Sequence, residues 1–124
     1  MAFSDVTPRV VSAVATPVKV TLAGTVVAGD LIGFTTGWVR AVASATAPIA
    51  ARLVAIEDGV SGDVIDATPF AAITSYTGGT AGSQLFLSST AGGVKESVTG
   101  SVYQKVGMMV SATVGMLYPG ITQE

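Results

Sequence analysis

The 124-residue chain contains no cysteine, no histidine and no asparagine. Without cysteine and histidine, the usual ligands of zinc, haem and iron–sulfur centres are missing, together with the thiol nucleophile and the commonest general base. Without asparagine there can be no N-linked glycan, and without cysteine the redox compartment cannot be inferred. The composition therefore predicts a protein with no metal site and no cofactor.

Charge is scarce as well. Only 11% of the residues are charged, against roughly 25% in an average soluble domain, and the formal net charge is −2. The basic residues are scattered through the sequence, so we expect no patch for phosphate and no nucleic-acid partner. A folded chain of this mass exposes on the order of 6,000 Å². With so few charges to cover it, we expect part of that surface to be buried against copies of the chain or another protein.

Long apolar segments that could target or anchor the chain are also missing. The run VVSAVA (10–15) is short for a signal peptide, and Asp5 lies where such a peptide is basic, so we expect an uncleaved chain. Residues 106–123 carry no charge, but their glycines together with Ser111, Thr113 and Pro119 disfavour a membrane span. We expect no membrane partner.

Alternation of apolar and polar residues indicates strands with one buried face. Val18, Val20 and Leu22 alternate with polar residues before Gly24, and the even positions of 102–118 are mostly apolar. We expect the latter segment to bury its even positions and to contain a turn or bulge near 111–113 or at a glycine. Other short runs bounded by glycine occupy 31–35, 38–43, 52–56, 64–73 and 85–88.

These patterns predict an all-β fold, either a small β-barrel or a β-sandwich of short antiparallel strands. Residues 18–124 form a single β domain in this interpretation, preceded by an extended N-terminal arm over 1–17. The alanine-rich segment 41–51 is expected to be a loop, because Pro48 and its β-branched neighbours oppose a helix.

Two segments resemble each other. AGDLIGFTTGWVRAV (28–42) and AGSQLFLSSTAGGVKESV (81–98) both begin with Ala-Gly-polar, continue through a short apolar run and reverse at glycine. Glycine adopts positive φ without steric cost, so the two segments predict two similar β-hairpins that turn the sheet sharply. If one of them touches a partner, we expect the first, because it carries Trp38 and Arg40.

The arm and the first hairpin supply the candidate partner-binding residues. Pro8 and Pro17 bracket the arm and favour extended backbone before them. Its valines could add a strand to the sheet edge of a neighbour. Trp38 is either a core anchor or, with Arg40 on the same face of a strand, part of a partner surface. The candidate residues are Val6, Val10, Val11, Val14, Trp38 and Arg40.

No pattern of residues indicates catalysis. Glu57 and Asp58 are adjacent, so on a strand they point to opposite faces and do not form a carboxylate pair. The turn EDGVSGDVIDA (57–67) lacks the aspartate spacing of an EF-hand, which favours a solvated turn. No Gly-x-Ser-x-Gly elbow occurs, although a Ser-Lys dyad with Lys95 or Lys105 stays open. We therefore expect no catalytic residue and no small-molecule substrate.

The order of these features resembles the capsid decoration, or cement, proteins of tailed bacteriophages. In that family a Gly-x-x-Leu-Tyr/Phe-Leu-Ser segment, a Gly-Gly turn and a Gln-x-Val-Gly-x-x-Val strand close a small β domain. The matching segments here are Gly82 to Ser88, Gly92-Gly93 and Gln104 to Val110. The resemblance covers about residues 18 to 118 and rests on glycines and apolar positions.

The resemblance implies a non-enzymatic structural protein of the virion, made in the host cytoplasm and located on the outer capsid surface. Such proteins bind the assembled head, usually as homotrimers, and clamp neighbouring major capsid subunits against internal DNA pressure. The N-terminal arm often reaches onto the capsid lattice. The motifs carry over no individual contact residue.

Two other functions stay open from the residues alone. A carbohydrate-binding or adhesin-like β module would stack sugar rings on Trp38, Tyr76 and Tyr103. A hydrolase would use the acidic residues, of which there are eight. Few aromatic residues and no clustering of them in the sequence weigh against the first of these alternatives.

Overall fold

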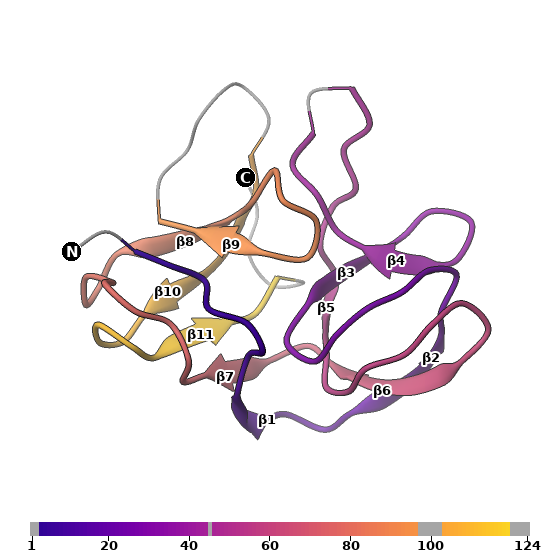
Figure 1. The fold of residues 1–124 in the computed structure, drawn as a ribbon, viewed down its shortest axis with the longest axis horizontal. Helices are drawn as coiled ribbons and strands as arrows, with labels where there is room; N and C mark the ends of the chain where they lie inside the picture. The colour runs from indigo at the N-terminus through magenta and orange to yellow at the C-terminus, as the bar shows by residue number, and fades with distance from the viewer. Residues whose placement is uncertain (1–2, 45, 97–102, 120–124) are drawn as a thin grey trace.

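The computed structural model describes residues 3–44, 46–96 and 103–119, which form short β-strands and no helix (Figure 1). The strands are β1 (Val11–Val14), β2 (Val18–Thr21), β3 (Leu31–Phe34), β4 (Trp38–Arg40), β5 (Leu53–Ala55), β6 (Val64–Thr68), β7 (Ala71–Ile73), β8 (Gln84–Leu87), β9 (Val94–Lys95), β10 (Lys105–Met109) and β11 (Gly115–Leu117).

The strands form two antiparallel sheets. Six strands are arranged in the order β1-β7-β11-β10-β8-β9 and five in the order β2-β6-β5-β3-β4. Figure 1 shows the two sheets on opposite sides of the molecule, with β1 and β2 consecutive in the chain but in different sheets. The all-β prediction is confirmed. Of the two architectures left open, the structure is consistent with the β-sandwich, because the sheets do not close into a barrel.

Strand alternation explains how the core is divided. Leu31 and Val54 belong to a large apolar cluster that includes residues of both sheets, whereas their neighbours Ile32 and Ala55 belong to a smaller cluster. Since successive side chains of a strand point to opposite faces, the five-stranded sheet buries apolar groups on both of its faces. Full burial of a leucine or isoleucine contributes about 1.5–3 kcal/mol, so both clusters stabilise this sheet.

Both predicted hairpins are present. β3 pairs with β4 and β8 pairs with β9, each antiparallel. Gly29, Gly82 and Gly92 have positive φ, as their place in the turns requires. The predicted loop over 41–51 is also found: the described residues of this segment form no helix, and Val42 and Ile49 form an isolated bridge.

The C-terminal strands depart from the predicted alternation. Val106 is buried as expected, but beyond it the buried side chains are those of Met109 and Leu117, at odd positions. The pairing of β10 with β8 shifts register between Lys105 and Gly107, and such a bulge moves all later side chains to the other face. The prediction that even positions face the core is therefore wrong after residue 106. The predicted turn at 111–113 is confirmed by the 2.8 Å bond from Val110 N to Val114 O.

Candidate functional site

The N-terminal segment lies on the domain itself. We call residues 3–15 the strap. Its strand β1 pairs antiparallel with β7, and Ser4 forms a bridge with Thr77, with N···O distances of 2.8 and 3.1 Å in the two directions. In Figure 1 the strap crosses the face between the two sheets before it reaches β1. The segment forms a strand over Val11–Val14, and its contacts are with its own chain, because β7 offers an edge for pairing.

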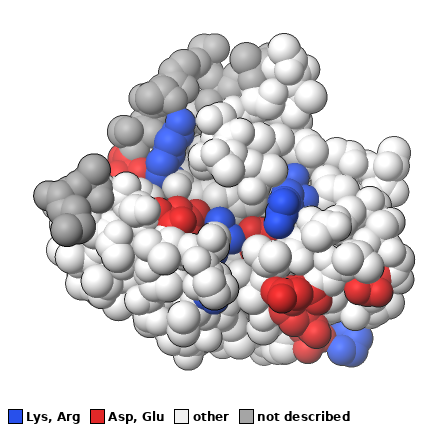
Figure 2. All heavy atoms as spheres, in the orientation of Figure 1, with Lys and Arg blue, Asp and Glu red and all other residues white. Residues whose placement is uncertain are grey.

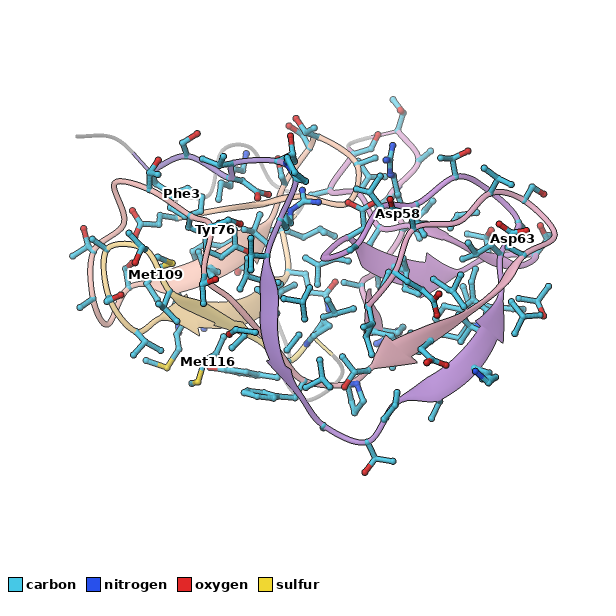
Figure 3. The ribbon with its side chains drawn as sticks, turned by 60° about the horizontal axis from the view of Figure 1, so that its bottom comes forward. Phe3, Asp58, Asp63, Tyr76, Met109 and Met116 are labelled. Atoms are coloured by element: carbon cyan, nitrogen blue, oxygen red, sulfur yellow. The ribbon has the colours of Figure 1, made fainter. Side chains whose placement is uncertain are left out.

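The strap also closes the larger core. Phe3 lies beside Tyr76, with ring centroids 5.3 Å apart, and both Phe3 and Val11 pack against the larger cluster (Figure 3). Tyr76 is buried, and its hydroxyl has no hydrogen-bond partner among the described residues. Burial raises the pKa of this phenol well above its usual value, and the nearby charge of Asp5 raises it further. Removing the strap would therefore expose part of the core.

A chain of four charges holds the strap in place, and we call it the ionic latch: Asp5, Arg9, Asp30 and Arg40. Arg9 binds Asp5 through Nε and Nη2 at 2.9 and 3.0 Å, and it binds Asp30 through Nη1 at 2.6 Å. Arg40 Nε binds the other Asp30 oxygen at 2.7 Å. Only 6% of the Arg9 side chain and 2% of the Asp30 side chain are exposed. These are therefore buried, charge-assisted bonds.

Burial and pairing act in opposite directions on Arg9. Burial alone would lower the pKa of its guanidinium, whereas the hydrogen bonds and charges of Asp5 and Asp30 raise it, and the net effect is an increase. Arg9 therefore stays charged. A buried charge without its partners would cost several kcal/mol, so burial of Arg9 at this place requires both carboxylates, Asp5 from the strap and Asp30 from the rest of the domain.

Glycines from the two similar sequence segments surround the latch. A Cβ on Gly29 would lie 2.7 Å from Arg9 Cδ, and one on Gly92 would lie 2.6 Å from Asp30 Oδ1. Both glycines also have positive φ. The two similar segments thus meet at the latch. There the backbone at Gly29 and Gly92 lies so close to the buried charged side chains that a Cβ atom would not fit.

The surface is hollowed on both sides of the strap. Figure 2 shows charged side chains of both signs gathered along the middle of this face. Two hollows of about 350 Å³ each include Thr7 and Arg9 in their walls; one also includes Arg40 and Asp58, the other Asp5 and Ser88. The strap therefore separates two hollows, and Arg9 of the latch lies in the walls of both.

The candidate residues of the strap differ in exposure. Val6, Val10 and Val14 are exposed, with 54% of Val10 accessible, whereas Val11 is partly buried against the larger cluster. β1 is the outermost strand of the six-stranded sheet, and no described strand pairs with its outer side. Val14, and Val10 directly before the strand, therefore lie at an open sheet edge, whereas Val6 lies outside β1.

Trp38 and Arg40 have different roles. Trp38 is half-buried against the smaller cluster, and Arg40 neutralises Asp30 in the latch. The exposed aromatic of this hairpin is Phe34, with 60% of the residue accessible and its ring edge-on to Trp38 at 5.5 Å. Sequence reasoning did not select Phe34, although its place opposite Trp38 across the hairpin turn was the available signal.

The residues of the two alternative functions are not assembled into a site. Tyr76 is buried, while Tyr103 is exposed and contacts Phe86, so the structure does not bring Trp38, Tyr76 and Tyr103 together. In the turn 57–67, Asp58 accepts the Ala28 amide and Asp63 accepts the Val60 amide, and Figure 3 shows the two carboxylates apart. No group of three or more acidic side chains in the described part of the chain could hold a metal ion.

No protein-family model, curated protein or solved structure matches the chain. Within the described residues, no helix has the length and apolar character needed to cross a membrane.

Proposed function

We propose that the chain is a non-enzymatic structural protein of a tailed phage, which binds the outer surface of the capsid and stabilises contacts between major capsid subunits. The proposal rests on the sequence resemblance of residues 18–118 and on one structural observation, the unprotected edge of β1. In this proposal the protein is located on the virion, acts as a homotrimer, and has the major capsid protein as its partner.

The two sheets end in four outer strands, β1, β9, β2 and β4, and of these β1 and β2 differ in how they resist pairing. Edge strands of soluble proteins usually carry charges that block the addition of another strand. β2 follows this rule, since Lys19 lies on it and bonds Asp66 at 2.7 Å. β1 does not, because residues 10–17 carry no charge and Val10 and Val14 are exposed. A strand from a partner can therefore add to β1 through backbone hydrogen bonds.

A short edge strand of this kind is suited to binding a repeating surface, such as a capsid lattice, by several copies at once. β1 has four residues and shifts register against β7 between Val11 and Ala13, so a single added strand makes few bonds. Weak contacts of this size become effective when several copies bind a repeating surface at once, because later contacts form at high effective concentration. An assembled capsid presents such a surface, and a trimer would engage it at three places.

The test is to place charge on the edge without disturbing the core. Val10→Lys/Val14→Lys should reduce co-sedimentation with empty phage heads at least about tenfold, since each lysine opposes strand addition. Val64→Lys is the matched control, because 59% of Val64 is exposed but β6 is an inner strand of the other sheet. Undiminished binding by a folded double variant would contradict the proposal. Deleting residues 1–17 is not equivalent, because it also removes Phe3 and Arg9 from the fold.

The glycan-binding alternative has less support. Stacking on sugar rings requires exposed aromatic faces, and of its three candidate residues only Tyr103 is exposed. Glycan-array binding that is lost in Tyr103→Ala, together with no binding of the unchanged protein to heads, would favour this alternative over the capsid.

A further inference from the structure

We propose that the strap exchanges between copies of the chain: residues 3–15 of one copy bind, on a second copy, the surface that they cover in this structure, which we call the groove. The occupant of the groove is thus defined, because the structure already holds that segment in it. Exchange concerns self-association and is independent of binding to a capsid.

The groove is built for one specific segment. It offers the β7 edge to β1, the Thr77 backbone to Ser4, and a slot beside Gly29 and Asp30 to the Arg9 side chain. All of these groups belong to residues 29–94, and none of them depends on which copy supplies the strap. A strap from a second copy makes the same contacts, which is the condition for domain swapping.

The latch divides into two neutral pairs, one in the strap and one in the rest of the domain, which we call the body. Asp5 and Arg9 both belong to the strap and share two hydrogen bonds, whereas Asp30 and Arg40 both belong to the body and lie 2.7 Å apart. When the strap leaves, it breaks one ion pair, Arg9 to Asp30, and each half keeps a charge of zero. Neither the released strap nor the body then holds a buried charge without a partner. The free-energy cost of releasing the strap therefore does not include the cost of an unpaired buried charge.

The end of the strap supplies a hinge. Ala15 makes the last bonds of the strap to the rest of the domain: its N donates to Phe70 O at 3.0 Å, and its O accepts from Thr68 Oγ1 at 3.2 Å. β2 begins at Val18. Thr16 and Pro17 lie between them and are exposed. Proline restricts Thr16 to extended backbone, which disfavours a tight reversal of the chain at this place. A rotation at this place redirects the whole strap while β2 stays paired with β6.

Single cysteines can test the exchange, because the chain has none of its own. Ser4 and Thr77 exchange two backbone hydrogen bonds, and Cα atoms of such a pair are about 5.5 Å apart, within the range of a disulfide. The double variant Ser4→Cys/Thr77→Cys should first close within one chain under mild oxidation. If it forms no disulfide, either within one chain or between two, the strap is not docked at Thr77 in solution, and the proposal fails at its first step.

The decisive experiment mixes Ser4→Cys protein with Thr77→Cys protein, incubates them together and then oxidises them. Exchange predicts a covalent mixed dimer on a non-reducing gel, well above the amount formed by Ser4→Cys with Val60→Cys, whose exposed cysteine lies outside the groove. Equal amounts in the two mixtures, with the double variant closing normally, would overturn the proposal. Arg9→Lys in the Ser4→Cys partner should speed mixed-dimer formation at least about tenfold, because lysine cannot bond both carboxylates in the same way.

Discussion

Asp30→Asn is the most informative single substitution in this structure. The Asp30 carboxylate accepts hydrogen bonds from Arg9, Arg40 and the Val27 amide at 2.6, 2.7 and 2.9 Å. Asparagine has nearly the same volume, but it carries no charge, and its NH₂ group would face a donor where one carboxylate oxygen accepted before. The change therefore removes the negative charge that joins Arg9 to Arg40 in the latch, and it does so without opening a cavity.

The expected loss of unfolding free energy follows from the burial of the Asp30 carboxylate. Breaking a buried charge pair costs about 3–5 kcal/mol. We expect the lower end, about 3 kcal/mol, because Arg9 keeps both bonds to Asp5, and Arg40, with 36% of its side chain exposed, can bind water instead. Unfolding entropy of about 2.1 cal/mol/K per residue then predicts a melting temperature about 11 °C lower. Since domains are stable by about 5–15 kcal/mol, the variant should still fold.

The assay is urea and thermal unfolding followed by fluorescence of Trp38, the single tryptophan. Asp66→Asn is the matched control: it removes the partner of Lys19, also 2.7 Å away, but 73% of the Lys19 side chain is exposed. Exposed ion pairs contribute little, so this control should unfold almost like the unchanged protein. Equal shifts in the two variants would refute the argument, because burial would then not decide the strength of these pairs.

Three further predictions concern the latch and the neighbouring Tyr76. Gly92→Ala should destabilise the domain more than Gly62→Ala in urea unfolding, because both have positive φ but only the Gly92 Cβ would collide, with Asp30; equal losses would contradict the collision. Tyr76→Phe should leave stability unchanged or raise it, since it removes a buried hydroxyl that has no described partner. Because the pKa of Tyr76 is raised in the folded state, its contribution to stability is complete below about pH 10 and is lost as the pH rises above that, where the unfolded phenol ionises. Urea midpoints measured from about pH 9 to 11 should fall less steeply in Tyr76→Phe than in the unchanged protein, and parallel slopes would contradict this.

Local patterns in the sequence determined much of the fold. Alternation in Val18–Leu22, the short apolar runs and the glycine turns predicted the all-β class and both hairpins, because a strand's burial pattern and a turn's φ are properties of a few neighbouring residues. The same reasoning failed after residue 106. The bulge at Lys105–Gly107 depends on the partner strand β8, which alternation within one segment does not reveal.

Only the tertiary structure decided where the N-terminal segment lies and what holds it. Asp5 and Arg9 are distant in sequence from Asp30 and Arg40, and each is an ordinary surface residue when it is considered alone. Whether a charge can be buried depends on its partners and on the solvent excluded around it, and both are properties of the assembled fold. The sequence by itself thus determined the strands and their turns, and long-range pairing of charges decided that the predicted arm is a strap on its own domain.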